Sequence, residues 1–131
     1  MRVVIDTNVV VSALFFGGLP DKLLGLALGG KIQAVASAEI ISEYLETYQE
    51  LAQKTTRRAM GKVLSEVLEP IEIISPKSKI EICRDPDDNK FINCAVDGKC
   101  KYIVSGDKDL LTIKSYKGVK IISVREFIDK N

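Results

Sequence analysis

The sequence predicts an α/β fold built on a parallel sheet with helices on both faces. Short apolar runs rich in valine and isoleucine alternate with segments whose apolar residues recur at helical spacing. Uninterrupted apolar runs of this kind are typical of strands buried on both faces of a parallel sheet. With 131 residues and a hydrophobic content of 46%, the chain is expected to form a single domain over residues 1–131.

The first strand and the two helices after it are predicted from local patterns. Residues 2–5 form an apolar run rich in valine, which predicts a buried strand, and residues 9–16 are apolar enough for a buried helix. The next helix has Pro20 in its first turn and ends at Gly29 and Gly30.

A second and a third strand are expected on either side of two more helices. Residues 32–36 are apolar and predict a strand, and Ser37 is a favourable N-cap for the helix that follows. The apolar residues of this helix recur at positions 40, 41, 44, 45, 48 and 51. A further helix is predicted over residues 55–68, and the third strand over residues 70–75.

The rest of the chain continues the alternation after a polar connection at residues 76–88. Its predicted elements are a helix ending near Gly98, a strand at 102–107, a short helix at 108–113, a strand at 119–123 and a final helix. The final helix opens with Ser123 and Glu126 in the spacing of a capping box. The sheet is therefore expected to have about five strands.

The composition excludes several kinds of chemistry. The chain contains no histidine, which excludes histidine-based catalytic triads and histidine metal sites. Catalysis would have to depend on carboxylates, lysines, hydroxyls or an ion bound through oxygen. The three cysteines, Cys83, Cys94 and Cys100, form no C-x-x-C pair and are expected to be reduced thiols.

Charge and hydropathy favour a cytoplasmic protein without a membrane partner. Lysine and arginine number 19 against 18 acidic residues, so no global field favours a nucleic acid or a membrane. The apolar runs are far shorter than the roughly 18 residues of a spanning helix. An acidic residue follows the N-terminus too soon for a signal peptide.

Three aspartates are expected at one edge of the sheet. Asp6 directly follows the first strand, Asp107 follows the fourth, and Asp88 begins the helix that leads into the fourth strand. Parallel sheets bind ligands beyond the carboxyl ends of their strands, and right-handed crossovers bring the start of that helix to the same edge. Converging carboxylates repel one another, and Mg²⁺ or Mn²⁺ would relieve this repulsion. Such an ion also turns bound water into a nucleophile for phosphodiester cleavage.

A fourth acid is expected from the helix that follows the second strand. Glu43 lies about one turn from Ser37 and beside the apolar positions Ile40 and Tyr44, so it would lean over the sheet edge near Asp6. Acidic residues recur at helical spacing along this helix, which also fits a solvated face.

Four segments of the chain together resemble a known family. They are "VVIDTNVVVSAL", "SAEIISEYLE", "DPDDNKFINCAV" and "YIVSGDKDLL". They resemble the PIN domain family of Mg²⁺-dependent ribonucleases, which includes the toxin nucleases of VapBC-type toxin-antitoxin pairs. The matching positions are Asp6-Thr7-Asn8, Glu43, Asp88 with Ala95 seven residues later, and Asp107.

The resemblance implies a small α/β/α sandwich that hydrolyses RNA with Mg²⁺ or Mn²⁺. Asp6, Asp88 and Asp107 would hold the ion, and Glu43 would position or bind the attacking water. Glu43 and Asp109 are additional candidate ligands. Three polar neighbours are candidates for supporting roles: Asn8 for a bond to a ligand, and the hydroxyls of Thr7 and Ser105 for orienting carboxylates. The resemblance also implies a toxin role, a cognate antitoxin protein and a homodimer or higher even oligomer.

Each site residue also has a structural interpretation. Asp6 is a favourable N-cap for the helix after it. In "DPDDN" the aspartates fit turn and cap positions, and Asp85 before Pro86 is typical of a turn. Asp107 after Ser-Gly fits an Asx turn, and the hydroxyls fit strand ends that need backbone partners.

A cluster of basic residues is the candidate contact for RNA. Lys54, Arg57, Arg58 and Lys62 share one helix face with no acidic residue among them. A solvated face or a docking surface for a partner protein would show the same pattern. Two functions other than a toxin also stay open at this stage: a housekeeping RNA-processing nuclease and a non-catalytic RNA-binding module.

Overall fold

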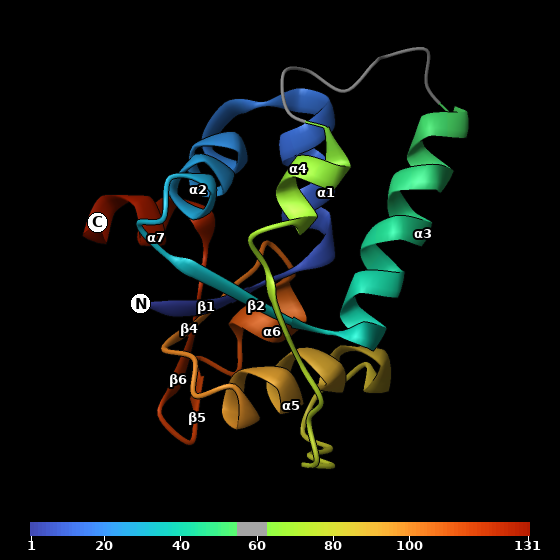
Figure 1. The fold of residues 1–131 in the computed structure, drawn as a ribbon. Helices are drawn as coiled ribbons and strands as arrows, with labels where there is room; N and C mark the ends of the chain where they lie inside the picture. The colour runs from blue at the N-terminus through green and yellow to red at the C-terminus, as the bar shows by residue number, and fades with distance from the viewer. Residues whose placement is uncertain (55–62) are drawn as a thin grey trace.

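The computed structural model describes residues 1–54 and 63–131, and Figure 1 shows its fold. The strands are β1 (Arg2–Ile5), β2 (Gln33–Ser37), β3 (Glu72–Ile74), β4 (Tyr102–Val104), β5 (Ser115–Tyr116) and β6 (Val119–Ile122). The helices are α1 (Thr7–Phe16), α2 (Gly18–Leu28), α3 (Ala38–Lys54), α4 (Leu64–Leu68), the 3₁₀ turn η1 (Pro86–Asp88), α5 (Asn89–Asp97), α6 (Lys108–Leu111) and α7 (Val124–Lys130).

The described strands form one sheet in the order β3-β2-β1-β4-β6-β5. In the interior of the sheet, β1 pairs in parallel with β2 and β4, so that Val3 lies opposite both Ala34 and Tyr102. β3 and β6 extend the parallel arrangement outward. Because these strands run in one direction, the residues that follow β1 and β4 leave the sheet at the same edge.

The sixth strand, β5, was not predicted. It runs antiparallel to β6 and is joined to it by a turn in which Lys117 and Gly118 have φ angles of 47° and 83°. The strand has only two residues, Ser115–Tyr116, which form no apolar run. Patterns of hydrophobicity cannot detect such a strand, because the turn and the pairing with β6 define it. Antiparallel edge strands are common on otherwise parallel sheets.

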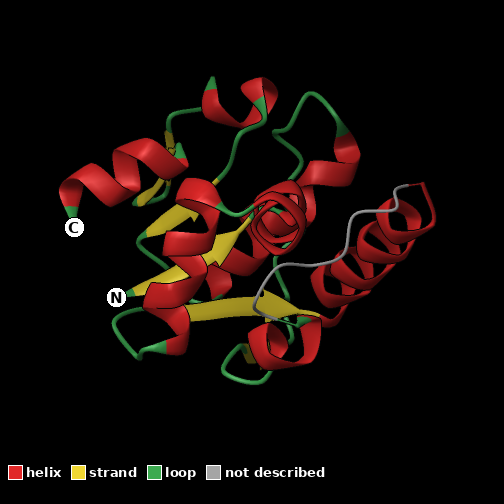
Figure 2. Ribbon diagram, turned by 90° about the horizontal axis from the view of Figure 1, so that it is seen from above, coloured by secondary structure: helices red, strands yellow, loops and turns green. Residues whose placement is uncertain are grey.

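Helices cover both faces of the sheet, which confirms the predicted α/β/α sandwich. On one face, α5 packs against β1, β2 and β4. On the other face, α1 and α2 pack together, and α7 packs against α2 (Figure 1). α3 packs against α1 and also contacts α5. In both ribbon views α3 and α7 lie at opposite ends of the molecule (Figure 1 and Figure 2).

Two predicted helix starts are confirmed by side-chain capping. The Ser37 hydroxyl accepts a hydrogen bond from the Ile40 backbone N–H at 3.2 Å, and the Ser123 hydroxyl accepts one from Glu126 N–H at 3.1 Å. Each bond satisfies a backbone donor that the first turn of a helix leaves without an intrahelical partner.

Several predicted boundaries differ from the structure. α1 begins at Thr7 rather than at position 9, and β4 ends at Val104, so residues 105–107 form a turn. β3 is shorter than the predicted strand. Of the predicted helix at 55–68, residues 55–62 lie outside the described residues, and α4 covers most of the remainder.

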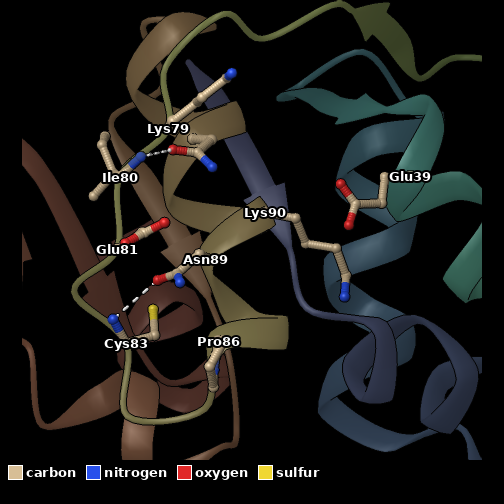
Figure 3. A pocket seen from close by; sticks show the side chains of 9 residues that line it. Glu39, Lys79, Ile80, Glu81, Cys83, Pro86, Asn89 and Lys90 are labelled. Carbon is tan, nitrogen blue, oxygen red and sulfur yellow. Dashed lines mark hydrogen bonds between the residues drawn. The ribbon is translucent and has the colours of Figure 1, made fainter.

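The polar connection at residues 76–85, here called the strap, is held by α5. Side-chain oxygens at every fourth residue of α5 accept hydrogen bonds from backbone N–H groups of the strap. They are Asp97 with Ser78 at 2.8 Å, Asn93 with Ile80 at 2.8 Å and Asn89 with Cys83 at 2.9 Å. Figure 3 shows the last two of these bonds. The strap therefore has a defined path along α5 that ends at the aspartate-rich turn before that helix.

The three cysteines are free thiols, as expected. Burial raises the pKa of Cys94 to about 12, and it raises the pKa of Cys83 and of Cys100 to about 11. Thiols with such a pKa are poor nucleophiles at neutral pH.

Among the described helices, no single one has the length and apolar character to cross a membrane. α1 and α2 are long and apolar enough to cross a membrane only if they are counted as one span, and the chain bends by 104° between them.

Candidate active site

The loops after β1 and β4 meet at the carboxyl edge of the sheet. The backbone N–H of Asp6 donates to the Val104 carbonyl at 2.9 Å, and Ser105 N–H donates to the Ile122 carbonyl at 3.0 Å. These bonds continue the pairing of the strands by one residue. They bring the turn that contains Asp107 beside Asp6.

Asp6 is 5% exposed, and its Oδ2 atom accepts a hydrogen bond from the Ser105 hydroxyl at 2.5 Å. Asp6 occupies the N-cap position of α1, but its side chain makes no capping hydrogen bond. Burial raises the pKa of Asp6, the bond from Ser105 opposes this shift, and the charges of Asp107 and Glu43 add to it. The Asp6 carboxylate is thus buried close to other acids.

Asp88 and Asp107 face one another as a second pair of acids at this edge. Burial raises the pKa of Asp88 to about 7, and a hydrogen bond with the Asp107 carboxyl and the charge of that group contribute to the shift. Asp85 and Asp6 raise this pKa further. The carboxyl groups of Asp88 and Asp107 are therefore close enough to share a proton, and Asp6 lies within electrostatic reach of both.

Asp107 and Asp85 also make the turn and cap hydrogen bonds that their structural interpretation predicts. Asp107 Oδ1 accepts from the Asp109 backbone N–H at 3.1 Å and so caps α6. Asp85 Oδ1 accepts from Asp87 N–H at 3.0 Å and caps η1. Asp107 uses its Oδ1 atom in its own turn.

Glu43 reaches the site from α3, but protein groups engage both of its oxygens. Oε1 lies 2.7 Å from the Lys90 ammonium nitrogen, and Oε2 accepts a hydrogen bond from the Thr7 hydroxyl. The next residue, Tyr44, is buried and donates a hydrogen bond from its phenol to the Ile5 carbonyl, which ties α3 to the end of β1.

Lys90 is a site residue that sequence reasoning missed. Its side chain is 6% exposed. Its ammonium group donates to the Asp87 carbonyl at 2.7 Å and lies 3.2 Å from Asp87 Oδ1, in addition to its contact with Glu43. Burial lowers the pKa of Lys90, but the bonds and charges of Glu43 and Asp87 outweigh this effect and raise it overall. The sequence does contain a signal for this role. Lys90 lies four residues before Cys94, which places a charged residue on the buried, apolar face of α5.

The remaining candidates lie at the margins of the site. Asn8 is exposed and lines a groove of about 390 Å³ together with Asp107. Asp109 is half-buried, and its Oδ1 atom lies 3.9 Å from the guanidinium of Arg84. A larger cavity of about 550 Å³ is lined by Lys90 and Asn89 (Figure 3).

The predicted basic cluster is described only in part. Lys54, the last residue of α3, is exposed and lines a groove with Asn8 and Phe16. Arg57, Arg58 and Lys62 lie outside the described residues.

The donor atoms suit a hard divalent cation. Carboxylate oxygens are the ligands that Mg²⁺ and Mn²⁺ prefer, and the carboxylates of Asp6, Asp88 and Asp107 have no lysine or arginine partner among the described residues. Within residues 1–54 and 63–131, however, no three Asp, Glu or Cys side chains are already arranged to hold one ion. An ion would therefore have to draw the carboxylates together.

Comparison with known proteins supports this interpretation of the fold. A family model described as a PIN domain matches residues 2–109. An uncharacterized protein of Methanocaldococcus jannaschii is 35% identical over 145 residues, an alignment that covers 99% of this chain and 91% of that protein. The matched region contains β1, β4 and all the acids discussed above. The chain therefore belongs to the PIN domain family.

Proposed function

We propose that this protein is a Mg²⁺- or Mn²⁺-dependent endoribonuclease that hydrolyses phosphodiester bonds of RNA. One observation carries the proposal: Asp6, Asp88 and Asp107, from three separate segments, share one edge of the sheet and pair with no described lysine or arginine. PIN domains are generally metal-dependent nucleases, so family membership supports a hydrolase.

Each residue would have a distinct role in the reaction. Asp6, Asp88 and Asp107 would hold the ion, with Asp109 as an outer ligand. The bound ion would supply an activated water and would neutralise charge on the phosphate. Glu43 would help to position or bind this water.

Polar neighbours would support these groups. The Ser105 hydroxyl would orient Asp6, and the Thr7 hydroxyl would orient Glu43, through the hydrogen bonds described above. Asn8, exposed beside Asp107, would donate a hydrogen bond to the RNA. Lys54, together with Arg57, Arg58 and Lys62, would contact the phosphate backbone.

We further propose that the nuclease acts in the cytoplasm as the toxin of a toxin-antitoxin pair, as a homodimer or a higher even oligomer. A short neighbouring gene that encodes a DNA-binding protein would support this role. Expression of the nuclease alone should then arrest growth, and co-expression of the neighbouring protein should restore it. Growth that is unaffected by the active nuclease would argue for RNA processing instead.

The proposed activity is tested by incubating the purified protein with a mixed pool of fluorescently labelled RNA. The reactions contain Mg²⁺ or Mn²⁺, or EDTA, and compare the wild type with Asp6→Asn. Asp129→Asn is a matched control, because Asp129 is an exposed aspartate on α7, away from the carboxyl edge.

We expect ion-dependent cleavage by the wild type and by Asp129→Asn, and no cleavage in EDTA or by Asp6→Asn. Cleavage by Asp6→Asn at the wild-type rate would exclude Asp6 from the reaction. A wild type that binds RNA but cleaves no RNA with either ion would indicate a non-catalytic binding module.

A further inference from the structure

The ammonium group of Lys90 lies inside the acidic site rather than at its surface. Lys90 is the second residue of α5, two positions after Asp88, and its side chain is 6% exposed. Figure 3 shows this side chain extending away from α5 toward the neighbouring helices. A charged group this buried is stable only when it is paired and hydrogen-bonded.

The contacts of Lys90 satisfy its full donor capacity. An ammonium group has three N–H donors. Three oxygens surround this one: Glu43 Oε1 at 2.7 Å, the Asp87 carbonyl at 2.7 Å and Asp87 Oδ1 at 3.2 Å. The second oxygen of Glu43 is occupied by the Thr7 hydroxyl. Glu43 is therefore neutralised and held by groups of the protein itself.

The other acids at this edge lack such a partner. Among the described residues, no lysine or arginine lies within ion-pair distance of Asp6, Asp88 or Asp107. The acidic site thus has two parts. One part, at Glu43, already contains a cation, and the other, at the three aspartates, does not.

We propose that Lys90 is a built-in cation that fills the Glu43 part of the site, so that the protein takes up one divalent ion, at the three aspartates, rather than two. This inference rests on the proposed function. Two-ion nuclease sites place their ions about 3.5–4 Å apart between shared carboxylates. A second ion at Glu43 would have to displace Lys90 from this carboxylate and leave the buried ammonium group with Asp87 as its remaining partner, which is strongly unfavourable.

The proposal is tested by counting bound Mn²⁺ ions, a measurement that does not depend on activity. Each variant is titrated with Mn²⁺, and the free ion is followed by electron paramagnetic resonance. We expect one ion per chain for the wild type and for Lys90→Arg, which keeps the charge. We expect two ions for Lys90→Met, which removes the charge but keeps a similar length.

A double variant identifies the position of the extra ion. Adding Glu43→Gln to Lys90→Met should return the count to one, because it removes the carboxylate that the second ion needs. Circular dichroism establishes that each variant is folded. If Lys90→Met does not fold, Glu43→Gln alone still tests the idea: its ion count should equal that of the wild type, and a count below one would show that the ion needs Glu43.

Two ions bound by the wild type would overturn the inference, as would one ion bound by a folded Lys90→Met. Either result together with RNA cleavage by the wild type would leave the proposed function intact. Failure of the proposed function has a different signature, in which the wild type binds no Mn²⁺ and cleaves no RNA.

Discussion

At the scale of single residues, the raised pKa values of Asp6 and Asp88 mean that these two residues hold their protons more tightly than free carboxyls do. Burial is the largest cause for both Asp6 and Asp88, and neighbouring carboxylates add to it. A raised pKa means that the ionised form is disfavoured in the folded protein. A bound cation would reverse this effect, so these residues connect ion binding to stability.

The raised pKa of Asp88 leads to a pH dependence of stability without a metal ion. Its pKa is about 7 in the folded protein, against 3.8 as the ordinary value. Between these values the unfolded chain releases a proton that the folded protein retains. The contribution of Asp88 to stability therefore falls as the pH rises from about 4 to 7 and is constant above that range. Since Asp88 is partly solvated, we expect a loss on the order of 1 kcal/mol after screening by solvent.

This loss is measured by urea unfolding in EDTA at several pH values, with Asp88→Asn for comparison. The asparagine variant should lack this part of the pH dependence, while contributions from all other groups remain. Parallel stability curves for the two proteins would contradict a raised pKa at Asp88.

Mn²⁺ should stabilise the folded protein through the three aspartates. An ion that binds only the folded state adds about 2.7 kcal/mol at a concentration of roughly 100 times its Kd. Asp6→Asn should lose most of this gain relative to its own metal-free form, whereas Asp129→Asn should keep it. Thermal unfolding with and without the ion measures the effect. Equal stabilisation of the wild type and Asp6→Asn would exclude Asp6 as a ligand.

At the scale of helices and strands, close packing at the end of α5 sets the position of that helix against the sheet. Gly98 follows α5, and a Cβ atom there would lie 2.8 Å from the Cys94 carbonyl oxygen and 3.0 Å from the Ile74 side chain. The side chain of Val35 would be 3.1 Å away. The close approach of α5 to β2 and β3 thus depends on the absence of a side chain at this position.

Two glycine-to-alanine substitutions test this packing. Gly98→Ala should destabilise the fold by about 1–3 kcal/mol, because backbone and core atoms would have to move. Gly25→Ala is the matched control, since Gly25 lies within α2 and a Cβ there would meet nothing within 4 Å. It should stabilise the protein by about 0.5–1 kcal/mol through helix propensity. Urea unfolding of both variants gives the comparison, and equal effects would contradict the close packing at Gly98.

At the scale of the whole molecule, β1 connects the layers. It lies between β2 and β4, α5 packs across it, and Asp6 and Thr7 follow it directly into the site. Val3, Val4 and Ile5 are buried in the core. Because the site residues extend from the same strands that fill the core, we expect the site and the core to unfold together.

Cooperative unfolding over the whole chain is the corresponding prediction for a single domain. The chain has no tryptophan, so tyrosine fluorescence reports the surroundings of buried Tyr44 and Tyr102, while far-ultraviolet circular dichroism reports the helices. The two signals should change at the same urea concentration. Separate transitions would show that part of the chain unfolds on its own.

The sequence alone was sufficient to predict the α/β class, the five longer strands, the parallel sheet and the edge at which Asp6, Asp88 and Asp107 meet. These features follow from local hydrophobic spacing and from the single direction of parallel strands, both of which are present in the order of residues. The caps at Ser37 and Ser123 were predicted for the same reason, since a cap and its partner lie three residues apart.

Only the tertiary structure revealed the β5–β6 pairing and the enclosure of Glu43 by Thr7 and Lys90. Glu43 and Lys90 are 47 positions apart, and their contact depends on the rotation of α3 and α5 about their axes. Hydrophobic spacing predicts which face of a helix is buried, but it does not predict which polar side chain on that face meets a charge from another helix. For this reason the order of residues determined where the acids gather, and the packing of the helices decided which of them already has a cation.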